Sequence, residues 1–246
     1  MSKQKVFERP KSLSDVRFSY CAGCLHSVVH RMIAEVIDEL DLLDTAVGVC
    51  PVGCAVFMYD YLECDMIEAA HGRAPAVATG VKRVLPEAIV FTYQGDGDLA
   101  AIGMAETVHA ASRGENITVV FINNGTYGMT GGQMAPTTLI GERTTTCPSG
   151  RRPETAGYPI KVCELLSSLE GPSYIARVAP VSPAGITQTK AAIKKAFQKQ
   201  LDGKGFALVE VLSNCPTQWN MTPIESLKWI REKAVQYFPL GEFVDR

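Results

Sequence analysis

The sequence predicts an α/β protein whose mostly parallel sheet is covered by helices on both faces. Five short runs are nearly continuous in apolar residues, which is typical of strands buried on both faces. These runs lie at residues 46–50, 88–93, 117–122, 174–179 and 206–212. Stretches with helical spacing of apolar residues separate the runs, and this alternation predicts parallel strands joined by helices. Four of the loops after these runs are rich in Gly, Cys, Asp or Asn, so we expect a ligand at the carboxyl edge of the sheet.

Composition supports this class and excludes others. The chain has 246 residues, of which 46% are hydrophobic and 20% charged, with a net charge of -2. These values fit one large folded domain, and the near-neutral charge argues against a nucleic-acid-binding protein. The sequence has no run of about 18 apolar residues, so it predicts no membrane-spanning helix. The N-terminus lacks the apolar core of a signal peptide, so we expect a cytoplasmic protein whose eight cysteines are not paired as disulfides.

The remaining elements follow from helical periodicity and from its absence. We expect an N-terminal arm at residues 1–20 and a single domain at 21–246. Helices are expected at residues 25–40, 75–85, 99–113, 160–168 and 183–200. The segment 130–158 is rich in Gly, Pro and Thr and is too long for an ordinary connection, which indicates a functional loop or a subunit contact. The aromatic tail at 229–243 is either a further subunit contact or a packed amphipathic helix.

One aspartate has an environment suited to a metal ion and a phosphate. Asp96 stands between Gly95 and Gly97, directly after an expected strand and before an Ala-rich helix. Glycines let a phosphate approach the backbone closely, and a helix N-terminus attracts it, but a carboxylate there repels it unless a cation lies between them. Mg²⁺ prefers such oxygens, and Asn124 and the carbonyl of Thr126 follow the next strand. Either motif alone is more often a plain turn; the pair at this spacing favours a magnesium site.

The cysteines allow a second metal centre. Cys21 and Cys24 open the first expected helix with two residues between them, and two thiolates at that spacing can bind one metal centre. Spacing alone selects Cys50 and Cys54 to complete a zinc-like site with four cysteines. A zinc-stabilised module without catalysis is therefore one alternative.

A wider resemblance connects these motifs. The Gly-Asp-Gly at 95–97 with the Asn-Asn at 123–124 resembles the thiamine-diphosphate motif. The surrounding sequence resembles the β subunit of 2-oxoacid:ferredoxin oxidoreductases, with a likeness to the ketoisovalerate type, in the stretches HGRAPAVATG (71–80), QGDGDLAAIGMAE (94–106) and NNGTYGMTGGQMAPTT (123–138). The resemblance covers about residues 20–223 and implies the diphosphate-binding type of thiamine-diphosphate fold.

The resemblance also implies particular site residues. Mg²⁺ is expected on Asp96, Asn124 and the Thr126 carbonyl. Contacts with thiamine diphosphate are expected from Val52, Gly53, Cys54, Ala55, Arg73, Gly97, Asp98, Gly128 and Met129. A [4Fe–4S] cluster is expected on Cys21, Cys24, Cys54 and Cys215, which leaves Cys50 as a core residue. No catalytic residue is expected in this chain, because the glutamate that contacts the aminopyrimidine ring in this family belongs to a different domain.

The implied activity is the oxidative decarboxylation of a 2-oxoacid to acyl-CoA and CO₂, with CoA as co-substrate and electrons passed through the cluster to ferredoxin. The implied partners are an α subunit with the pyrimidine domain, a γ subunit and a ferredoxin-like δ subunit. Gly131 and Gly132 stand where some relatives carry a basic residue, which favours a branched-chain oxoacid over a dicarboxylate. A thiamine-diphosphate decarboxylase or lyase subunit without a cluster is the second alternative.

Overall fold

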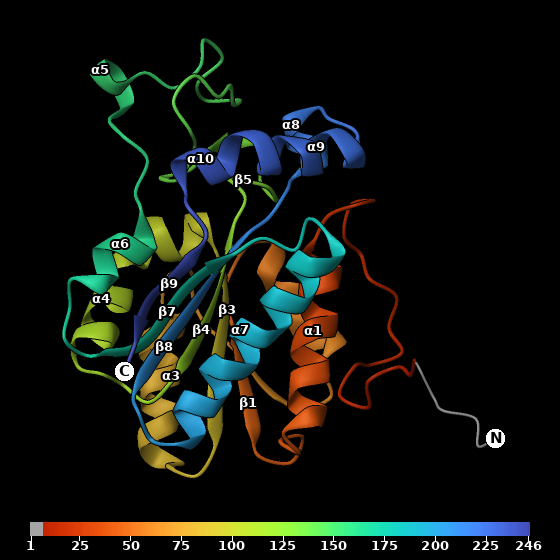
Figure 1. Ribbon diagram of the computed structural model, residues 1–246, viewed down its shortest axis with the longest axis vertical. Coiled ribbons are helices and arrows are strands. Elements are labelled where there is room, and N and C mark those ends of the chain that lie inside the picture. Colours follow the sequence, from red (N-terminus) through yellow and green to blue (C-terminus); the bar gives the residue numbers. More distant parts are fainter. Residues whose placement is uncertain (1–6) are drawn as a thin grey trace.

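The computed structural model describes residues 7–246 and has a seven-stranded sheet at its centre (Figure 1). In spatial order the strands are β2 (Asp65–Glu68), β1 (Ala46–Cys50), β3 (Ile89–Gly95), β4 (Thr118–Asn123), β8 (Phe206–Leu212), β7 (Pro172–Val178) and β9 (Gly241–Asp245). All neighbouring pairs are parallel except β7 and β9, which are antiparallel. The prediction of a mostly parallel sheet is therefore confirmed.

The five strands expected from apolar runs are present as β1, β3, β4, β7 and β8, and the two outer strands were not expected. The missed strands lie at the edges of the sheet, where only one neighbour covers them. Asp65 and Glu68 in β2 are exposed, and in β9 only Val244 is buried. An edge strand of this kind has no continuous apolar run, so the criterion that found the inner strands does not detect it.

Helices cover both faces of the sheet, as expected (Figure 1). On one face lie α1 (His26–Glu39) and α7 (Pro183–Leu201), whose apolar sides share a core with β3, β4 and β8. On the other face lie α3 (Ala74–Val84), α4 (Met104–Ser112) and α6 (Val162–Ser167), which enclose a second core.

One expected helix is interrupted. The helical stretch expected at 99–113 begins as a π-helical turn, η2 (Gly97–Ile102), which precedes α4. At the junction the N–H of Gly103 donates to the Asp98 carbonyl at 2.8 Å, which leaves five residues in the turn instead of four. The wider turn brings Asp98 into the loop region at the edge of the sheet.

A further layer covers the carboxyl edge of the sheet (Figure 1). It is formed by β5 (Thr126–Tyr127), β6 (Gln133–Met134), α5 (Pro153–Ala156), α8 (Pro216–Trp219), α9 (Pro223–Trp229), η3 (Ile230–Ala234) and α10 (Val235–Tyr237), and two short helices, η1 (Cys54–Phe57) and α2 (Met58–Tyr61), follow β1. Ile230, Ala234 and Phe238 are buried in a third core with Leu25 and Leu212. The tail is thus a packed helix that continues into β9, and its role as a subunit contact stays a prediction.

The long segment at 130–158 is organised by one buried cation. Arg151 is 4% exposed, and its guanidinium donates hydrogen bonds to six backbone carbonyls, at Ala135, Pro136, Thr138, Ala156, Gly157 and Tyr158. So many acceptors stabilise a buried charge, and the charge of Glu142 adds to this. The segment is therefore a fixed structure, and its role as a subunit contact stays a prediction.

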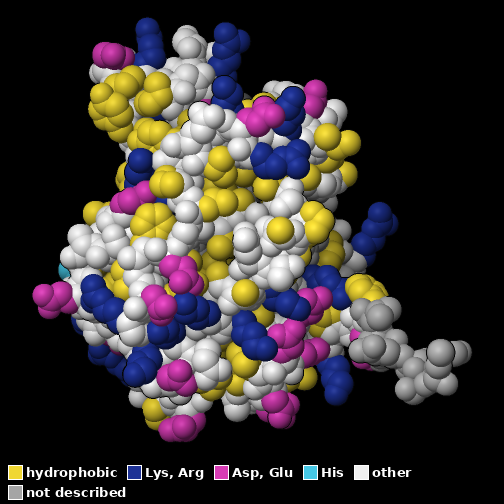
Figure 2. Space-filling model, in the orientation of Figure 1, with side chains coloured by type: hydrophobic (Ala, Val, Ile, Leu, Met, Phe, Trp, Pro, Cys, Tyr) yellow, Lys and Arg dark blue, Asp and Glu magenta, His cyan; other side chains and the backbone are white. Residues whose placement is uncertain are grey.

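The described part of the expected N-terminal arm contacts α1 and the segment before β2 of the same chain. Ser12 hydrogen-bonds to Asp38 of α1, and Leu13 forms an antiparallel bridge with Leu62. Residues 1–6 of the arm lie outside the described residues. Within residues 7–246, none of the helices has the length and apolar character needed to cross a membrane. On the face shown in Figure 2, basic and acidic side chains are interspersed.

Candidate functional site

A pocket at the carboxyl edge of the sheet is formed by the loops that follow β1, β3 and β4. It is lined by His26, Val52, Gly53, Cys54, Ala55, His71, Gly95, Asp96, Gly97, Asp98, Asn124, Thr126, Tyr127, Gly128, Met129 and Thr130. The three predicted magnesium ligands are in this wall, together with every predicted contact for thiamine diphosphate except Arg73. The parallel order β1, β3, β4 explains this grouping, because the carboxyl ends of neighbouring parallel strands meet at one edge.

Asp96 is a buried carboxylate at the base of the pocket, with 2% of its surface exposed. One oxygen accepts a hydrogen bond from the N–H of Gly97 at 2.8 Å, and the other accepts one from the Thr137 hydroxyl at 2.9 Å. Burial raises the pKa of Asp96 to about 6, and hydrogen bonds from Thr137 and from the backbone of Gly97, Gly125 and Thr126 act in the opposite direction. The folded chain therefore carries the cost of an ionised carboxylate at neutral pH, which a bound cation would offset.

Asn124 and Thr126 approach the pocket from a turn after β4. The side-chain oxygen of Asn124 accepts a hydrogen bond from the Thr126 N–H at 3.1 Å. The Thr126 hydroxyl donates to the Gln133 carbonyl at 2.9 Å, where β5 pairs with β6. The turn is thus braced on its far side by the two-stranded ribbon.

Asp98 also lines the pocket, but its carboxylate is hydrogen-bonded to other residues of the chain. Its carboxylate accepts hydrogen bonds from the Gly72 N–H at 2.7 Å and from Gln94 at 2.6 Å, and it pairs with His71 Nδ1 at 2.6 Å. Burial raises its pKa, while these partners lower it. Asp98 therefore holds the turn at 71–73 against η2.

Arg73 is not brought into the pocket. Its guanidinium pairs with Glu106 and donates to the Ile102 carbonyl at 3.3 Å, both on the η2–α4 side. His71, two residues earlier, lines the pocket instead. The expected contact between Arg73 and a diphosphate stays a prediction and has no geometric support here.

One glycine of the pocket is required by a close neighbour, and a second lies beside two cysteines. A side chain at Gly97 would overlap the Tyr127 ring, whose nearest atom lies 2.2 Å from the Cβ position. A Cβ at Gly128 would lie 3.4 Å from the Cys215 sulfur and 3.5 Å from the Cys54 sulfur. The backbone at Gly128 thus lies next to both the pocket and these two cysteines.

The four cysteines expected to hold a cluster are neighbours near this edge. Burial raises the pKa of Cys24 to about 12 and that of Cys215 to about 11, and in both cases the thiols of Cys54 and Cys21 raise it further. Cys50, in contrast, is in the first core, where its thiol donates to the Ile67 carbonyl. This position does not favour the zinc alternative that includes Cys50. Among residues 7–246, no three His, Cys, Asp or Glu side chains are grouped so as to hold a single metal ion.

A cluster of aromatic side chains and histidines behind the pocket was not predicted to belong to the site. His26 lines the pocket and pairs with the Tyr93 hydroxyl at 2.7 Å. The Tyr20 hydroxyl pairs with His30 Nε2 at 2.7 Å and donates to the Cys54 carbonyl at 3.1 Å. Single histidines on a helix have no diagnostic spacing, so only the packing of α1 against β3 reveals this connection.

These histidines predict an acid-sensitive fold. Burial lowers the pKa of His26 to about 4 and holds that of His30 well below its usual value. Below about pH 6.5 the unfolded chain takes up protons that the folded chain does not, so the free energy of unfolding decreases as the pH falls from about 6.5 toward 4. We expect the melting temperature of His30→Phe to depend less on pH over this range. The exposed His109→Gln is the control, and equal pH dependence in His30→Phe and the wild type would contradict the prediction.

Comparisons with known proteins agree with this geometry. Residues 51–211 match the family model described as the C-terminal thiamine pyrophosphate (TPP) binding domain of thiamine pyrophosphate enzymes. The ketoisovalerate oxidoreductase subunit VorA of Methanothermobacter thermautotrophicus is 51% identical over 245 residues, which cover all of this chain and 51% of the relative. The 2-oxoglutarate synthase subunit KorB of Methanocaldococcus jannaschii is 36% identical over 88% of this chain and 78% of the relative.

A solved structure has the same fold. The 2-oxoglutarate:ferredoxin oxidoreductase from Magnetococcus marinus, solved with 2-oxoglutarate, coenzyme A and succinyl-CoA bound, superposes with a TM-score of 0.78 at 23% identity, covering 99% of this chain and 87% of that chain. The present chain spans about half the length of its VorA relatives. The family match over most of the chain and the KorB relatives, which it covers largely, establish that it belongs to the thiamine pyrophosphate enzymes, as a thiamine-binding subunit of the 2-oxoacid:ferredoxin oxidoreductase family.

Proposed function

We propose that this chain is the β subunit of an enzyme that converts a 2-oxoacid and CoA to acyl-CoA and CO₂ and passes the electrons to ferredoxin. The observation that carries the proposal is that Asp96 and Asn124, from the ends of adjacent strands, meet in one glycine-lined pocket. The names of the VorA and KorB relatives support the reaction class. The neighbour solved with CoA and succinyl-CoA supports CoA as co-substrate.

The pocket fits magnesium and a diphosphate. Asp96 is a buried carboxylate that lines the pocket together with Asn124 and Thr126, so it can serve as the charged ligand of a cation. Asn124 and the Thr126 carbonyl would complete the protein's share of the ligands, since Mg²⁺ binds few protein oxygens and takes the rest from phosphate and water. Val52, Gly53, Cys54, Ala55, Gly97, Asp98, Gly128 and Met129 would then surround the cofactor.

The cysteines fit a [4Fe–4S] cluster better than a single ion. Each thiolate of such a cluster binds a different iron, so four sulfurs can surround it without meeting at one point. Cys21 and Cys54 raise the pKa of both Cys24 and Cys215, and the sulfurs of Cys54 and Cys215 both lie beside Gly128, which supports a common centre. Cys54 also lines the pocket, so the cluster and the thiamine site would be adjacent.

When bound, thiamine diphosphate supplies the carbanion chemistry and the cluster supplies one-electron transfer. The chain's own residues would bind and orient these groups. Asp96 would hold the cation, the π-helical turn would hold Asp98 and His71 at the wall, and Tyr20 would fix the Cys54 backbone through its carbonyl. The residue that activates the aminopyrimidine ring is expected from an α subunit, so we propose that this chain is inactive alone.

A branched-chain oxoacid is the proposed substrate. The VorA relative, named for ketoisovalerate, is 51% identical, whereas the KorB relatives are 32–37% identical. Gly131 and Gly132 follow the pocket residue Thr130 without a basic side chain that would bind a second carboxylate. The proposed partners are the α subunit, a γ subunit, a ferredoxin-like δ subunit and free ferredoxin.

The proposed reaction is tested by assaying the anaerobically co-purified complex for CoA-dependent reduction of a dye. We expect the highest kcat/KM with 2-oxoisovalerate among a panel that includes pyruvate, 2-oxoglutarate and indolepyruvate. A higher value with 2-oxoglutarate would contradict the branched-chain proposal alone. Decarboxylation without dye reduction would instead favour a decarboxylase or lyase.

The cluster predicts iron in the purified protein. We expect a brown protein with about four iron atoms per chain, and loss of most of this iron in Cys215→Ser. Cys147→Ser is the matched control, because Cys147 lies in the long segment and hydrogen-bonds with Thr144 through its backbone. A colourless wild-type protein without iron would refute the cluster and favour the alternatives.

A further inference from the structure

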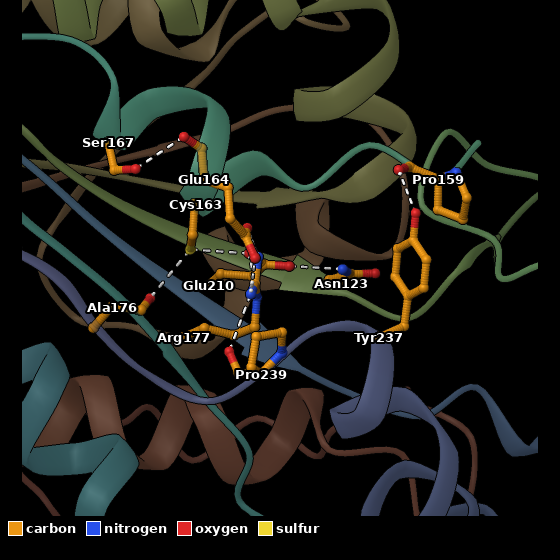
Figure 3. A network of polar contacts seen from close by, with 10 residues as sticks. All are labelled: Asn123, Pro159, Cys163, Glu164, Ser167, Ala176, Arg177, Glu210, Tyr237 and Pro239. Carbon is orange, nitrogen blue, oxygen red and sulfur yellow. Dashed lines mark hydrogen bonds and ion pairs between the residues drawn. The ribbon is translucent and has the colours of Figure 1, made fainter. Parts of the chain in front are cut away.

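A buried polar network lies behind the turn that carries the proposed magnesium ligands (Figure 3). Arg177 of β7 and Glu210 of β8 are both fully buried, and Arg177 Nε donates to Glu210 Oε2 at 2.9 Å. The other oxygen, Glu210 Oε1, accepts a hydrogen bond from Asn123 Nδ2 at 2.7 Å. Asn123 is the last residue of β4 and directly precedes Asn124.

The amide of Asn123 connects this network to the turn. Its Nδ2 faces Glu210, so its Oδ1 faces the other way and accepts a hydrogen bond from the Gly125 N–H at 3.3 Å. An asparagine amide can be rotated by 180° with little change of shape, and only its partners decide which end donates. Because a carboxylate accepts and never donates, Glu210 allows only the orientation in which Oδ1 holds Gly125.

Arg177 is itself held firmly. It donates to both oxygens of Glu164 of α6, at 3.0 and 2.5 Å, and to the Pro239 carbonyl at 3.1 Å. The rings of Phe238 and Phe243 lie within about 5 Å of its guanidinium. Burial lowers the pKa of Arg177, but the hydrogen bonds and charges of Glu164 and Glu210 outweigh this and raise it. Glu210 therefore keeps its charge partner and its position.

Stability alone does not account for this ion pair. Removing two charges from water is costly, and a pair of apolar side chains in the same volume is often as stable or more stable. An apolar pair cannot accept the hydrogen bond from Asn123, however. The feature that only the ionic pair provides is the orientation of the Asn123 amide.

We propose that Glu210, held by Arg177, is a positioning residue of the magnesium site. It fixes the Asn123 amide, which holds the Gly125 N–H and so presents Asn124 and the Thr126 carbonyl to the cation. This inference rests on the proposed function, because it assumes that Mg²⁺ and thiamine diphosphate bind in the pocket.

The test measures binding in the intact complex after removal of divalent cations. Thiamine diphosphate is titrated calorimetrically at several Mg²⁺ concentrations, which yields the apparent affinity for Mg²⁺. We expect Asn123→Ala to weaken Mg²⁺ binding about 10- to 100-fold, the usual effect of losing a group that orients a metal ligand. Cys163→Ala is the matched control, because the Cys163 thiol donates to Glu210 Oε2 at 3.0 Å on the side away from the turn. We expect it to bind Mg²⁺ as the wild type does.

A double-mutant cycle separates positioning by Glu210 from other effects of Asn123. In Glu210→Gln the amide oxygen would stay on Arg177, so an N–H would face Asn123 and its amide would rotate. We expect Glu210→Gln alone to weaken Mg²⁺ binding to a similar degree, and the double variant to be no weaker than Asn123→Ala. If Glu210→Gln does not fold, Glu210→Asp takes its place in the cycle, because its shorter side chain cannot reach both Arg177 and Asn123.

Two outcomes would overturn the inference while leaving the proposed function intact: unchanged Mg²⁺ affinity in Asn123→Ala, or an equal loss in Cys163→Ala. Additive losses in the cycle would also overturn it, because Glu210 would then not act through Asn123. A wild-type complex that binds no thiamine diphosphate with Mg²⁺ would refute the proposed function itself, and the inference with it.

Discussion

Asp96→Ala is expected to abolish magnesium-dependent binding of thiamine diphosphate and, with it, the activity of the reconstituted complex. The substitution removes the only carboxylate among the three proposed ligands, and a neutral set of oxygens holds Mg²⁺ poorly. The loss of affinity should exceed the roughly 100-fold that outer-shell changes cost at most. Calorimetric titration of the complex with thiamine diphosphate and Mg²⁺ measures it directly.

The isosteric variant Asp96→Asn sharpens this prediction. Burial raises the pKa of Asp96 to about 6, so between about pH 3.8 and 6 the folded chain holds a proton that the unfolded chain has lost. Stability therefore falls as the pH rises through this window, and above it the buried charge costs about 3 kcal/mol in the cation-free protein. We expect cation-free Asp96→Asn to melt at a higher temperature than the wild type at pH 8 and yet to bind no cofactor.

The two effects of Asp96→Asn have opposite signs, which distinguishes a functional ligand from a structural residue. Asp65→Asn is the control, because Asp65 is an exposed carboxylate on the edge strand β2. It should change neither the melting temperature nor cofactor binding. Retained magnesium-dependent binding in either Asp96 variant would refute the magnesium site.

Arg177→Met is expected to be strongly destabilising, by about 3–5 kcal/mol. It would leave Glu210 buried without its charge partner, since both side chains are 0% exposed in the wild type. For a chain of this length the melting temperature should fall by about 10 °C. Thermal unfolding followed by circular dichroism provides the measurement.

The surface pair of Lys228 and Glu232 provides the matched control. The two side chains are 63% and 57% exposed, and exposed ion pairs contribute about 0–1 kcal/mol, so Lys228→Met should melt close to the wild type. Replacing both partners, in Arg177→Met with Glu210→Leu, should recover much of the stability because no charge is left unpaired. A single variant as stable as the wild type would contradict the prediction.

The inner strands and the main motifs could be predicted from the sequence because each is formed by residues that are close together along the chain. A strand buried on both faces is mostly apolar at consecutive positions, as at residues 119–122 of β4 and 206–209 of β8. A ligand at the end of such a strand follows within a few residues, so Asp96 and Asn124 could be assigned before their proximity was known. The pairing of the motifs predicted correctly that both loops open on the same pocket.

Other features could not be predicted, because no pattern in the local sequence indicates them. The edge strands β2 and β9 are half exposed, and β9 joins the sheet only after the chain has passed through α9, η3 and α10. Arg73 has the charge expected of a diphosphate ligand, but its nearest acceptor is Glu106, 33 residues away. Which partner a long side chain reaches depends on the packing of α3 against α4, which spacing does not encode.

The class of fold, the order of the inner elements along the chain and the types of oxygen and sulfur ligand at the sheet edge follow from the residues alone. Tertiary structure alone decided which polar groups meet: Asn123 reaches Glu210 across 87 residues and Glu210 reaches Arg177 across 33. The physical reason is that buried apolar residues recur at regular positions along the chain, so the sequence shows them. A buried charge, in contrast, is stable only beside a specific partner, and the folded arrangement of the strands determines which residue that partner is.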